Sequence, residues 1–175
     1  MDKGLIHMYC GDGKGKTTAA IGLTVRAAGA GFRVVFVQFL KGGQTSELDV
    51  LRAMNGVTVM RLEKAFGFTW MLNDEQKGEL RAAHDHLFAQ AVQQCGDGKQ
   101  TLLVMDELVG TMDLELIDRG RVIGFLRNKP EDLEIVMTGR NPDDELTELA
   151  DYISEVRAVR HPMDKGIMAR RGIEF

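Results

Sequence analysis

Three glycines and two lysines occupy six consecutive positions, 11–16, in the stretch YCGDGKGKTTAA, which directly follows an apolar run. A glycine-rich turn between a strand and a helix presents backbone N–H groups and the positive end of the helix dipole to one space, and this favours a bound phosphate. Lys16 would add a mobile cation, and the Thr17 hydroxyl could ligate Mg²⁺. The stretch therefore predicts a nucleotide-phosphate site. The simpler alternative is a glycine turn that only caps a helix.

The glycine spacing departs from two common nucleotide-binding patterns. The pattern G-x-x-x-x-G-K-[ST] would place a glycine at position 10, where this chain has Cys10. The dinucleotide pattern G-x-G-x-x-G would need a glycine at position 16, where Lys16 stands. Lys14 is either a phosphate contact or an exposed loop cation. The residues that we expect to contact the nucleotide phosphates are Gly11, Asp12, Gly13, Lys14, Gly15, Lys16, Thr17 and Thr18.

A second candidate element is TLLVMDE, an apolar run that ends in Asp106 and Glu107. A buried strand that ends in carboxylates is typical of a nucleotide site in which they hold Mg²⁺ directly or through water. The alternative is a strand end with two solvated acids. A strand in the same sheet as the glycine-rich loop would favour the metal interpretation.

Further side chains have two interpretations each. The segment AFGFTWMLND, 65–74, contains the single tryptophan and two phenylalanines. It has no regular apolar period and is therefore predicted to be a loop. Its aromatic side chains either form a platform or lid for a ligand or pack in the core. His84 and His86 are two positions apart on an expected helix, cannot form an i, i+4 zinc pair, and read as surface or partly packed residues. A basic tail either contacts ligand anions or forms a solvated edge, and it comprises Arg157, Arg160, His161, Lys165, Arg170 and Arg171.

The elements that must position these residues alternate along the chain. Apolar runs rich in branched residues predict strands at 4–9, 33–39, 57–62, 101–108 and 133–139, with a further strand at 152–159. Helical composition predicts helices at 17–29, 46–54, 74–95 and 115–128, and a short helix after Asp143. Strands that are apolar on both faces and separated by helices indicate a parallel sheet covered on both sides. Ligands of such sheets bind beyond the carboxyl ends of the strands.

Composition limits the class of protein. A chain of 175 residues with 44% hydrophobic and 27% charged residues is typical of one globular domain, here 1–175. The net charge of −4 argues against a nucleic-acid partner, and no apolar run reaches the length that a membrane span needs. The N-terminus lacks the pattern of an export signal, so we expect a cytoplasmic protein. Cys10 and Cys95 are expected to be reduced core thiols.

Taken together, the motifs resemble those of the ATP:corrinoid adenosyltransferases. The landmarks are GDGKGKTTAA, RAAGAG, VQFLKG, GFTW, MDEL, TGR, LADYISEV and HPMDKGIMARRGIEF, and they cover nearly the whole chain. The resemblance implies an α/β P-loop NTPase (RecA-like) three-layer fold with a mostly parallel central sheet. It also explains Cys10, because the family shares the compressed glycine spacing.

The resemblance implies a particular reaction. A Co(I) corrinoid attacks C5′ of the ATP ribose and triphosphate leaves, so the bond that breaks is C–O; the triphosphate would lie in the loop in reversed polarity. Phe68 and Trp70 would lie against the lower corrin face and favour a four-coordinate Co(II) that is more easily reduced. Arg26 matches a position near the nucleotide. By this resemblance the catalytic residues are Lys16, Phe68, Trp70 and Glu107, and the metal-side residues are Thr17, Asp106 and Glu107.

The same resemblance implies ATP and a corrinoid as substrates, Mg²⁺ or Mn²⁺ as cofactor, a flavoprotein electron donor and a homodimer. Some members carry an N-terminal extension over a neighbouring subunit's site, which we expect to be absent or replaced here. Two alternatives use the same loop: a P-loop ATPase or small kinase in which Glu107 polarises water, and a non-catalytic carrier of nucleotide or corrinoid.

Overall fold

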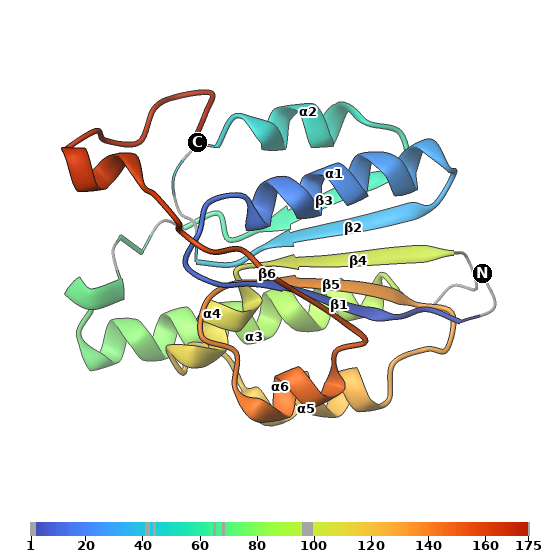
Figure 1. The fold of residues 1–175 in the computed structure, drawn as a ribbon. Coiled ribbons are helices and arrows are strands. Elements are labelled where there is room, and N and C mark those ends of the chain that lie inside the picture. Colours follow the sequence, from blue (N-terminus) through green and yellow to red (C-terminus); the bar gives the residue numbers. More distant parts are fainter. Residues whose placement is uncertain are drawn as a thin grey trace.

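The computed structural model describes residues 3–40, 43, 45–64, 66–67, 69–95 and 100–174. Strands and helices alternate from the first strand onward (Figure 1). The strands are β1 (Ile6–Cys10), β2 (Arg33–Gln38), β3 (Val57–Arg61), β4 (Thr101–Asp106), β5 (Glu134–Thr138) and β6 (Tyr152–Glu155). The helices are α1 (Lys16–Gly29), α2 (Glu47–Ala53), α3 (Asp74–Gln93), α4 (Leu108–Asp113), α5 (Arg119–Arg127) and α6 (Asp144–Leu149), with short 3-10 turns η1 (Thr69–Met71) and η2 (Pro162–Lys165).

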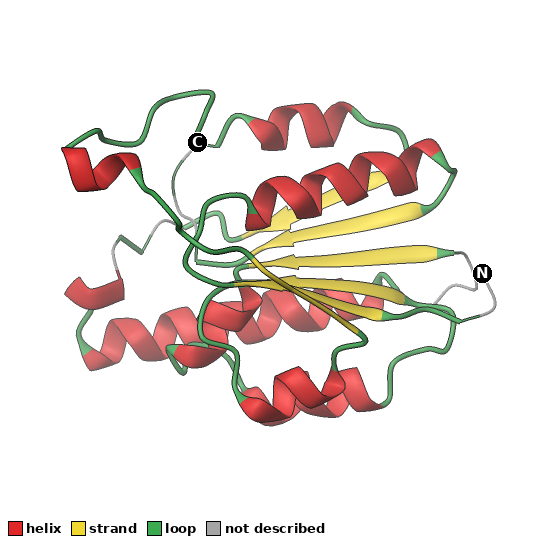
Figure 2. Ribbon diagram, viewed as in Figure 1, coloured by secondary structure: helices red, strands yellow, loops and turns green. Residues whose placement is uncertain are grey.

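The six strands form one sheet in the order β3-β2-β4-β5-β1-β6, and every neighbouring pair is parallel. Helices α1 and α2 cover one face of the sheet, and α3, α4, α5 and α6 cover the other, which gives three layers (Figure 2). This confirms the predicted three-layer α/β fold. β5 lies between β1 and β4, so the ends of these three strands meet at one edge.

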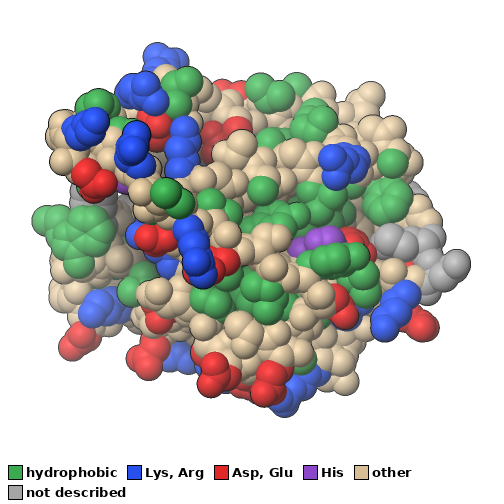
Figure 3. Space-filling model, viewed as in Figure 1, with side chains coloured by type: hydrophobic (Ala, Val, Ile, Leu, Met, Phe, Trp, Pro, Cys, Tyr) green, Lys and Arg blue, Asp and Glu red, His purple; other side chains and the backbone are tan. Residues whose placement is uncertain are grey.

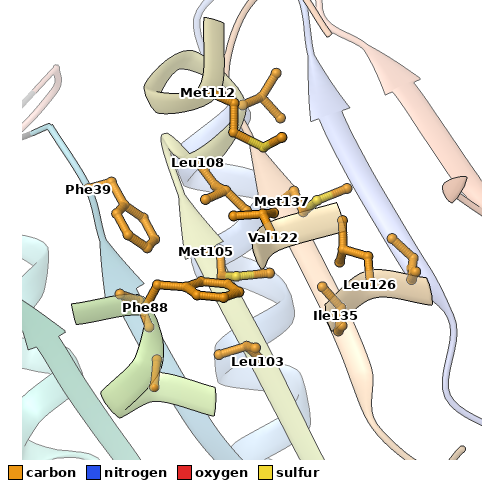
Figure 4. Packing of buried hydrophobic residues seen from close by; sticks show 14 of the residues in the cluster. Phe39, Phe88, Leu103, Met105, Leu108, Met112, Val122, Leu126, Ile135 and Met137 are labelled. Atoms are coloured by element: carbon orange, nitrogen blue, oxygen red, sulfur yellow. The ribbon is translucent and has the colours of Figure 1, made fainter. Parts of the chain in front are cut away.

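Successive side chains of each strand point to opposite faces of the sheet, and this explains why helices cover both faces. On β2, Val34 and Phe36 pack with α1 and α2, whereas Val35 and Val37 pack with the helices of the other face. β4 divides its side chains in the same way. Figure 4 shows the core on the α3 side of the sheet, where Met105 of β4 and Phe88 of α3 lie close to one another. Because both faces bury apolar side chains, the strands read as continuous apolar runs.

Several boundaries differ from the sequence-based expectation, and each difference has a local cause. The strand expected at 101–108 ends at Asp106, because Glu107 adopts a left-handed backbone (φ 64°) and α4 begins at residue 108; the sequence had not predicted α4. The strand expected at 152–159 ends at Glu155, because its partner β1 stops at Cys10. The helix expected from 115 begins at 119, where the Asp118 side chain accepts a hydrogen bond from the amide of Arg121.

The start of α3 follows expectation, whereas the start of α1 is built differently. Asn73 forms a capping box with Gln76, so α3 has a satisfied N-terminus. α1 follows Gly15, whose φ of 124° suits glycine alone, and no side chain caps its first amides. The amides at the N-terminus of α1 are therefore available to an anion.

Candidate functional site

The loop 11–15 joins β1 to α1 at the carboxyl edge of the sheet. At its end Lys16 is 7% exposed, and its Nζ donates to the carbonyl oxygens of Gly11 (2.6 Å) and Gly13 (2.9 Å). Burial lowers the pKa of Lys16, and the positive charge of Arg140 adds to this effect. The ammonium group is thus held inside the loop by neutral acceptors, where an arriving anion would stabilise its charged form.

The glycines at 11 and 13 are required by a neighbouring segment of chain. A Cβ on Gly11 would lie 2.4 Å from the carbonyl oxygen of Val156, and one on Gly13 would lie 2.7 Å from the carbonyl carbon of Arg157. The Gly13 amide also donates to the Val156 carbonyl at 2.8 Å. Asp12 accepts from the amide of Ala158 at 3.1 Å, and this bond lowers the pKa of its carboxyl group. The loop therefore packs directly on the chain that follows β6.

A hydrogen-bonded cluster joins the phosphate loop to the ends of β4 and β5. The carboxylate of Asp106 is fully buried, and its Oδ1 accepts from the hydroxyls of Thr17 and Thr138, both at 2.8 Å. Gln38 donates to Oδ2 at 3.4 Å. The hydroxyl of Thr138 accepts from the amide of Glu107 at 2.9 Å. Thr17 and Asp106, both expected on the metal side, are therefore in direct contact, and they are joined by Thr138, which the sequence analysis named only as part of the TGR landmark.

A cavity of about 1190 Å³ opens above these groups. It is lined by Asp12, Gly13, Lys14, Gly15, Lys16, Thr17, Thr18, Ile21, Leu40, Gly43, Thr45, Ser46, Glu47, Val50, Gly67, Glu107, Arg140, His161, Gly172, Ile173 and Glu174. Most of the predicted phosphate residues and Glu107 thus meet in one space of a size that suits a small-molecule ligand. Asp106 does not line the cavity itself but is joined to the lining by its hydrogen bond with Thr17.

The C-terminal segment forms one wall of the cavity. Lys14 lies 3.2 Å from Glu174 across this wall, so its side chain pairs with a carboxylate. Arg170 binds Glu174 through both its side chain and its backbone amide, and these bonds, with a smaller contribution from Lys14, lower the pKa of Glu174 to about 2. Figure 3 shows Lys and Arg side chains gathered over this segment. Arg157 pairs with Glu155 at 2.8 Å, so two of the tail cations are exposed and engaged with neighbouring carboxylates.

Of the predicted site residues that the structure describes, Gly11, Arg26, Trp70 and Asp106 do not line the cavity. Arg26 is exposed in the last turn of α1, away from the helix start that faces the cavity. Trp70 is 77% exposed in η1, a few residues beyond Gly67 at the cavity wall. Phe68 lies outside the residues that the structure describes. The aromatic segment thus leads away from the cavity wall with its tryptophan exposed, and the buried-packing alternative is wrong for Trp70.

His84 is fully buried, so its interpretation as a surface or partly packed residue is wrong. Its Nδ1 lies 2.9 Å from the Leu116 carbonyl, and its Nε2 lies 3.4 Å from the amide of Leu40. Burial lowers the pKa of His84 and so favours the neutral ring, which can donate at one nitrogen and accept at the other. The spacing of His84 from Leu80, Leu87 and Phe88 places it on the apolar side of α3, a signal that the sequence did contain.

Two other observations bear on the earlier expectations. Cys10 and Cys95 are both buried and free, which confirms the prediction of core thiols. Across the part of the chain that the structure describes, no helix combines the length and the apolar character that crossing a bilayer requires.

Comparison with known proteins identifies relatives along nearly the whole chain. The family model described as ATP:corrinoid adenosyltransferase BtuR/CobO/CobP matches residues 2–175. Corrinoid adenosyltransferase of Escherichia coli K12 is 33% identical over 174 residues, which cover 99% of this chain and 87% of that protein. Corrinoid adenosyltransferase of Sinorhizobium is 32% identical over 176 residues, with 99% and 81% covered. Corrinoid adenosyltransferase CobA of Salmonella typhimurium is 33% identical over 174 residues, with 99% and 87% covered.

Solved structures agree on the fold. The cytoplasmic domain of EssC matches with a TM-score of 0.56 at 17% identity, over 95% of this chain and 34% of that one. EssC (ATPases 2 and 3) from Geobacillus thermodenitrificans matches with a TM-score of 0.50 at 15% identity, over 97% and 35%. This chain thus spans about a third of the length of each, and the likeness supports the P-loop ATPase fold alone. By its sequence, matched by the family model from residue 2 to residue 175, the chain belongs to the ATP:corrinoid adenosyltransferase family.

Proposed function

We propose that this protein transfers the 5′-deoxyadenosyl group of ATP to the Co(I) centre of a corrinoid and releases triphosphate, in the formation of adenosylcobalamin. Family membership over nearly the whole chain supports the choice of substrates. The observation that carries the proposal is the convergence of Lys16, the uncapped N-terminus of α1 and Glu107 on one cavity.

The reaction is a nucleophilic substitution at carbon. The electron pair of Co(I) forms a Co–C bond to C5′ as the C5′–O bond breaks, and its electrons leave with the triphosphate. Negative charge therefore grows on the phosphate chain, which is the charge that the amides of the loop and Lys16 are placed to stabilise. We propose that Lys16 exchanges the carbonyls of Gly11 and Gly13 for phosphate oxygens when ATP binds.

We propose Mg²⁺ or Mn²⁺ as the cofactor, held by Thr17 and by the carboxylates of Asp106 and Glu107. Their donor atoms are hard oxygens, which these metals prefer. No group of three or more His, Cys, Asp or Glu residues gathers in the described part of the chain, so the phosphates and water would supply the remaining ligands. Within the same described residues, the buried Oε1 of Gln38, whose amide donates to Asp106, accepts no hydrogen bond and could accept one from a hydrating water. When bound, the metal would neutralise charge on the phosphate chain.

The corrin side of the proposal rests on the exposed aromatic segment. Trp70 and its neighbour Met71 are 77% and 72% exposed, which is unusual for large apolar side chains. We propose that Trp70, together with Phe68, covers the lower face of the corrin, where an aromatic ring offers no axial donor and so favours reduction of Co(II). The expectations of one domain over 1–175, a nucleotide contact by Arg26, a homodimer, a flavoprotein electron donor and a cytoplasmic location stay predictions.

Product analysis tests the proposal. The purified protein with Mg-ATP and chemically reduced corrinoid should give triphosphate and Co–C bonded corrinoid in a 1:1 ratio. Ion-exchange chromatography of the phosphates measures the first product, and the corrin absorption spectrum measures the second. Lys16→Ala should reduce the rate on the order of 10²–10³-fold, whereas Arg33→Ala, at the start of β2 and outside the cavity lining, should retain it. Release of ADP without a change in the corrin spectrum would instead support phosphoryl transfer.

A further inference from the structure

The turn that follows β5 brings an additional cation to the cavity. β5 lies between β1, which leads into the phosphate loop, and β4, which ends in Asp106. Thr138 at the end of β5 pairs in register with Tyr9 of β1, and Arg140 comes two residues later. Arg140 therefore emerges at the edge of the sheet between the loop and the Asp106 cluster, and it lines the same cavity as Lys16 and Glu107.

Both neighbours of Arg140 are fixed by tight contacts. Gly139 has φ 150°, its amide donates to the Tyr9 carbonyl at 3.2 Å, and a Cβ there would lie 2.5 Å from the amide nitrogen of Gly110. Asn141 has a left-handed backbone (φ 53°), and its Nδ2 donates to Asp113 at 3.1 Å. The direction in which Arg140 leaves the backbone is thus set by contacts to β1 and α4.

The charge of Arg140 acts on two other charged groups of the cavity lining. Its positive charge is felt by Lys16, whose pKa it lowers, and by Asp12, whose pKa it also lowers. Among the residues that the structure describes, no carboxylate forms an ion pair with Arg140. Two cations that repel one another across a cavity are stabilised together by a polyanion between them, and a guanidinium group can bind two phosphate oxygens at once.

We propose that Arg140 is a triphosphate-binding residue that acts opposite Lys16 and binds the phosphate chain more strongly as it leaves C5′. The proposal rests on the proposed function and deepens it, because it assigns a role at the leaving group to the arginine of the TGR landmark, which had no role until now. Arg140 differs from Lys16 in its position: it approaches from the β5 turn, whereas Lys16 lies inside the loop.

Two measurements on three variants test this role. Arg140→Ala and Arg140→Lys are compared with Arg121→Ala, a matched control on the exposed surface of α5. Calorimetry with inorganic triphosphate measures binding of the product, and steady-state assays with chemically reduced corrinoid give kcat and KM for ATP. Arg140→Ala should weaken triphosphate binding at least tenfold and lower kcat about 10²-fold, Arg140→Lys should recover part of both, and Arg121→Ala should change neither.

The outcomes separate this inference from the proposed function. If the wild-type protein adenosylates the corrinoid and Arg140→Ala matches Arg121→Ala in both measurements, the inference is wrong and the function stands. A higher KM with unchanged kcat also overturns it, because Arg140 would then bind substrate and transition state equally. If the wild-type protein releases no triphosphate, the proposed function fails, and unchanged triphosphate affinity in Arg140→Ala would overturn the inference independently.

Discussion

Replacement of Thr138 by valine should expose how much the buried cluster at the strand ends contributes. Valine has nearly the same shape as threonine but no hydroxyl. The substitution removes a donor to the buried carboxylate of Asp106 and the acceptor of the Glu107 amide, while Thr17 keeps its own bond to Asp106. Both losses occur at a fully buried side chain, so water cannot easily replace the missing partner.

The expected magnitude follows from these two bonds. A hydrogen bond to a charged group contributes about 1.5–3 kcal/mol, and an unsatisfied buried amide costs about 1–3 kcal/mol. We therefore expect the free energy of unfolding to fall by about 3–5 kcal/mol, which lowers the melting temperature of a chain of this size by roughly 6–20 °C. Thr138→Ser keeps both bonds and loses one methyl group, so it should cost only about 1 kcal/mol.

Thermal and urea unfolding followed by circular dichroism measure this difference, and the adenosylation assay reports its effect on Glu107. Valine should lower kcat at least tenfold, because the amide that fixes the left-handed Glu107 loses its acceptor, whereas serine should stay near wild type. The double variant with Thr17→Val should show a coupling of about 0.5–3 kcal/mol, since both hydroxyls donate to the same oxygen of Asp106. Equal stability of the valine and serine variants would refute the reasoning.

Two further predictions concern the aromatic segment and the buried histidine. Trp70→Ala should slow the reaction far more when it starts from Co(II) than when it starts from prereduced Co(I), and Met71→Ala is the exposed control. Equal losses of rate in the two assays would contradict the proposal that Trp70 covers the lower face of the corrin. Burial holds the pKa of His84 below its ordinary value near 6.5, opposed by the hydrogen bond to the Leu116 carbonyl and by the charge of Asp85. The unfolded chain therefore binds a proton first, and the free energy of unfolding should fall as pH drops below about 6.5. Urea unfolding at pH 7.5 and 5.5 should show less of this dependence in His84→Gln than in His86→Gln, and an identical dependence in both would argue against it.

Much of the fold could be predicted because apolar runs and stretches of helical composition alternate along most of the chain. The pairing of Thr17 with Asp106 was also predictable, since a strand that ends in carboxylates beside a phosphate loop can lie only at one edge of a parallel sheet. The order of the strands could not be read in the same way. Thr138 and Arg140 reach the site only because β5 inserts between β1 and β4, and no local pattern specifies that insertion.

Other differences arise from the backbone. α4 was missed because a left-handed residue, Glu107, separates a strand and a helix that are both apolar, so the sequence shows one continuous run. The two-residue spacing of His84 from His86 excludes a zinc pair but says nothing about burial, which is decided by its helical spacing from the buried residues Leu80, Leu87 and Phe88 of α3.

The close packing of Gly11 and Gly13 against the backbone of Val156 and Arg157 has a consequence for protein engineering. This phosphate loop cannot be transplanted into another nucleotide-binding scaffold as a short insert, because its shape depends on a second backbone segment from near the other end of the sequence. A chimera would have to exchange both segments together, and a library that randomises positions 11 and 13 would return glycine even under selection for folding alone.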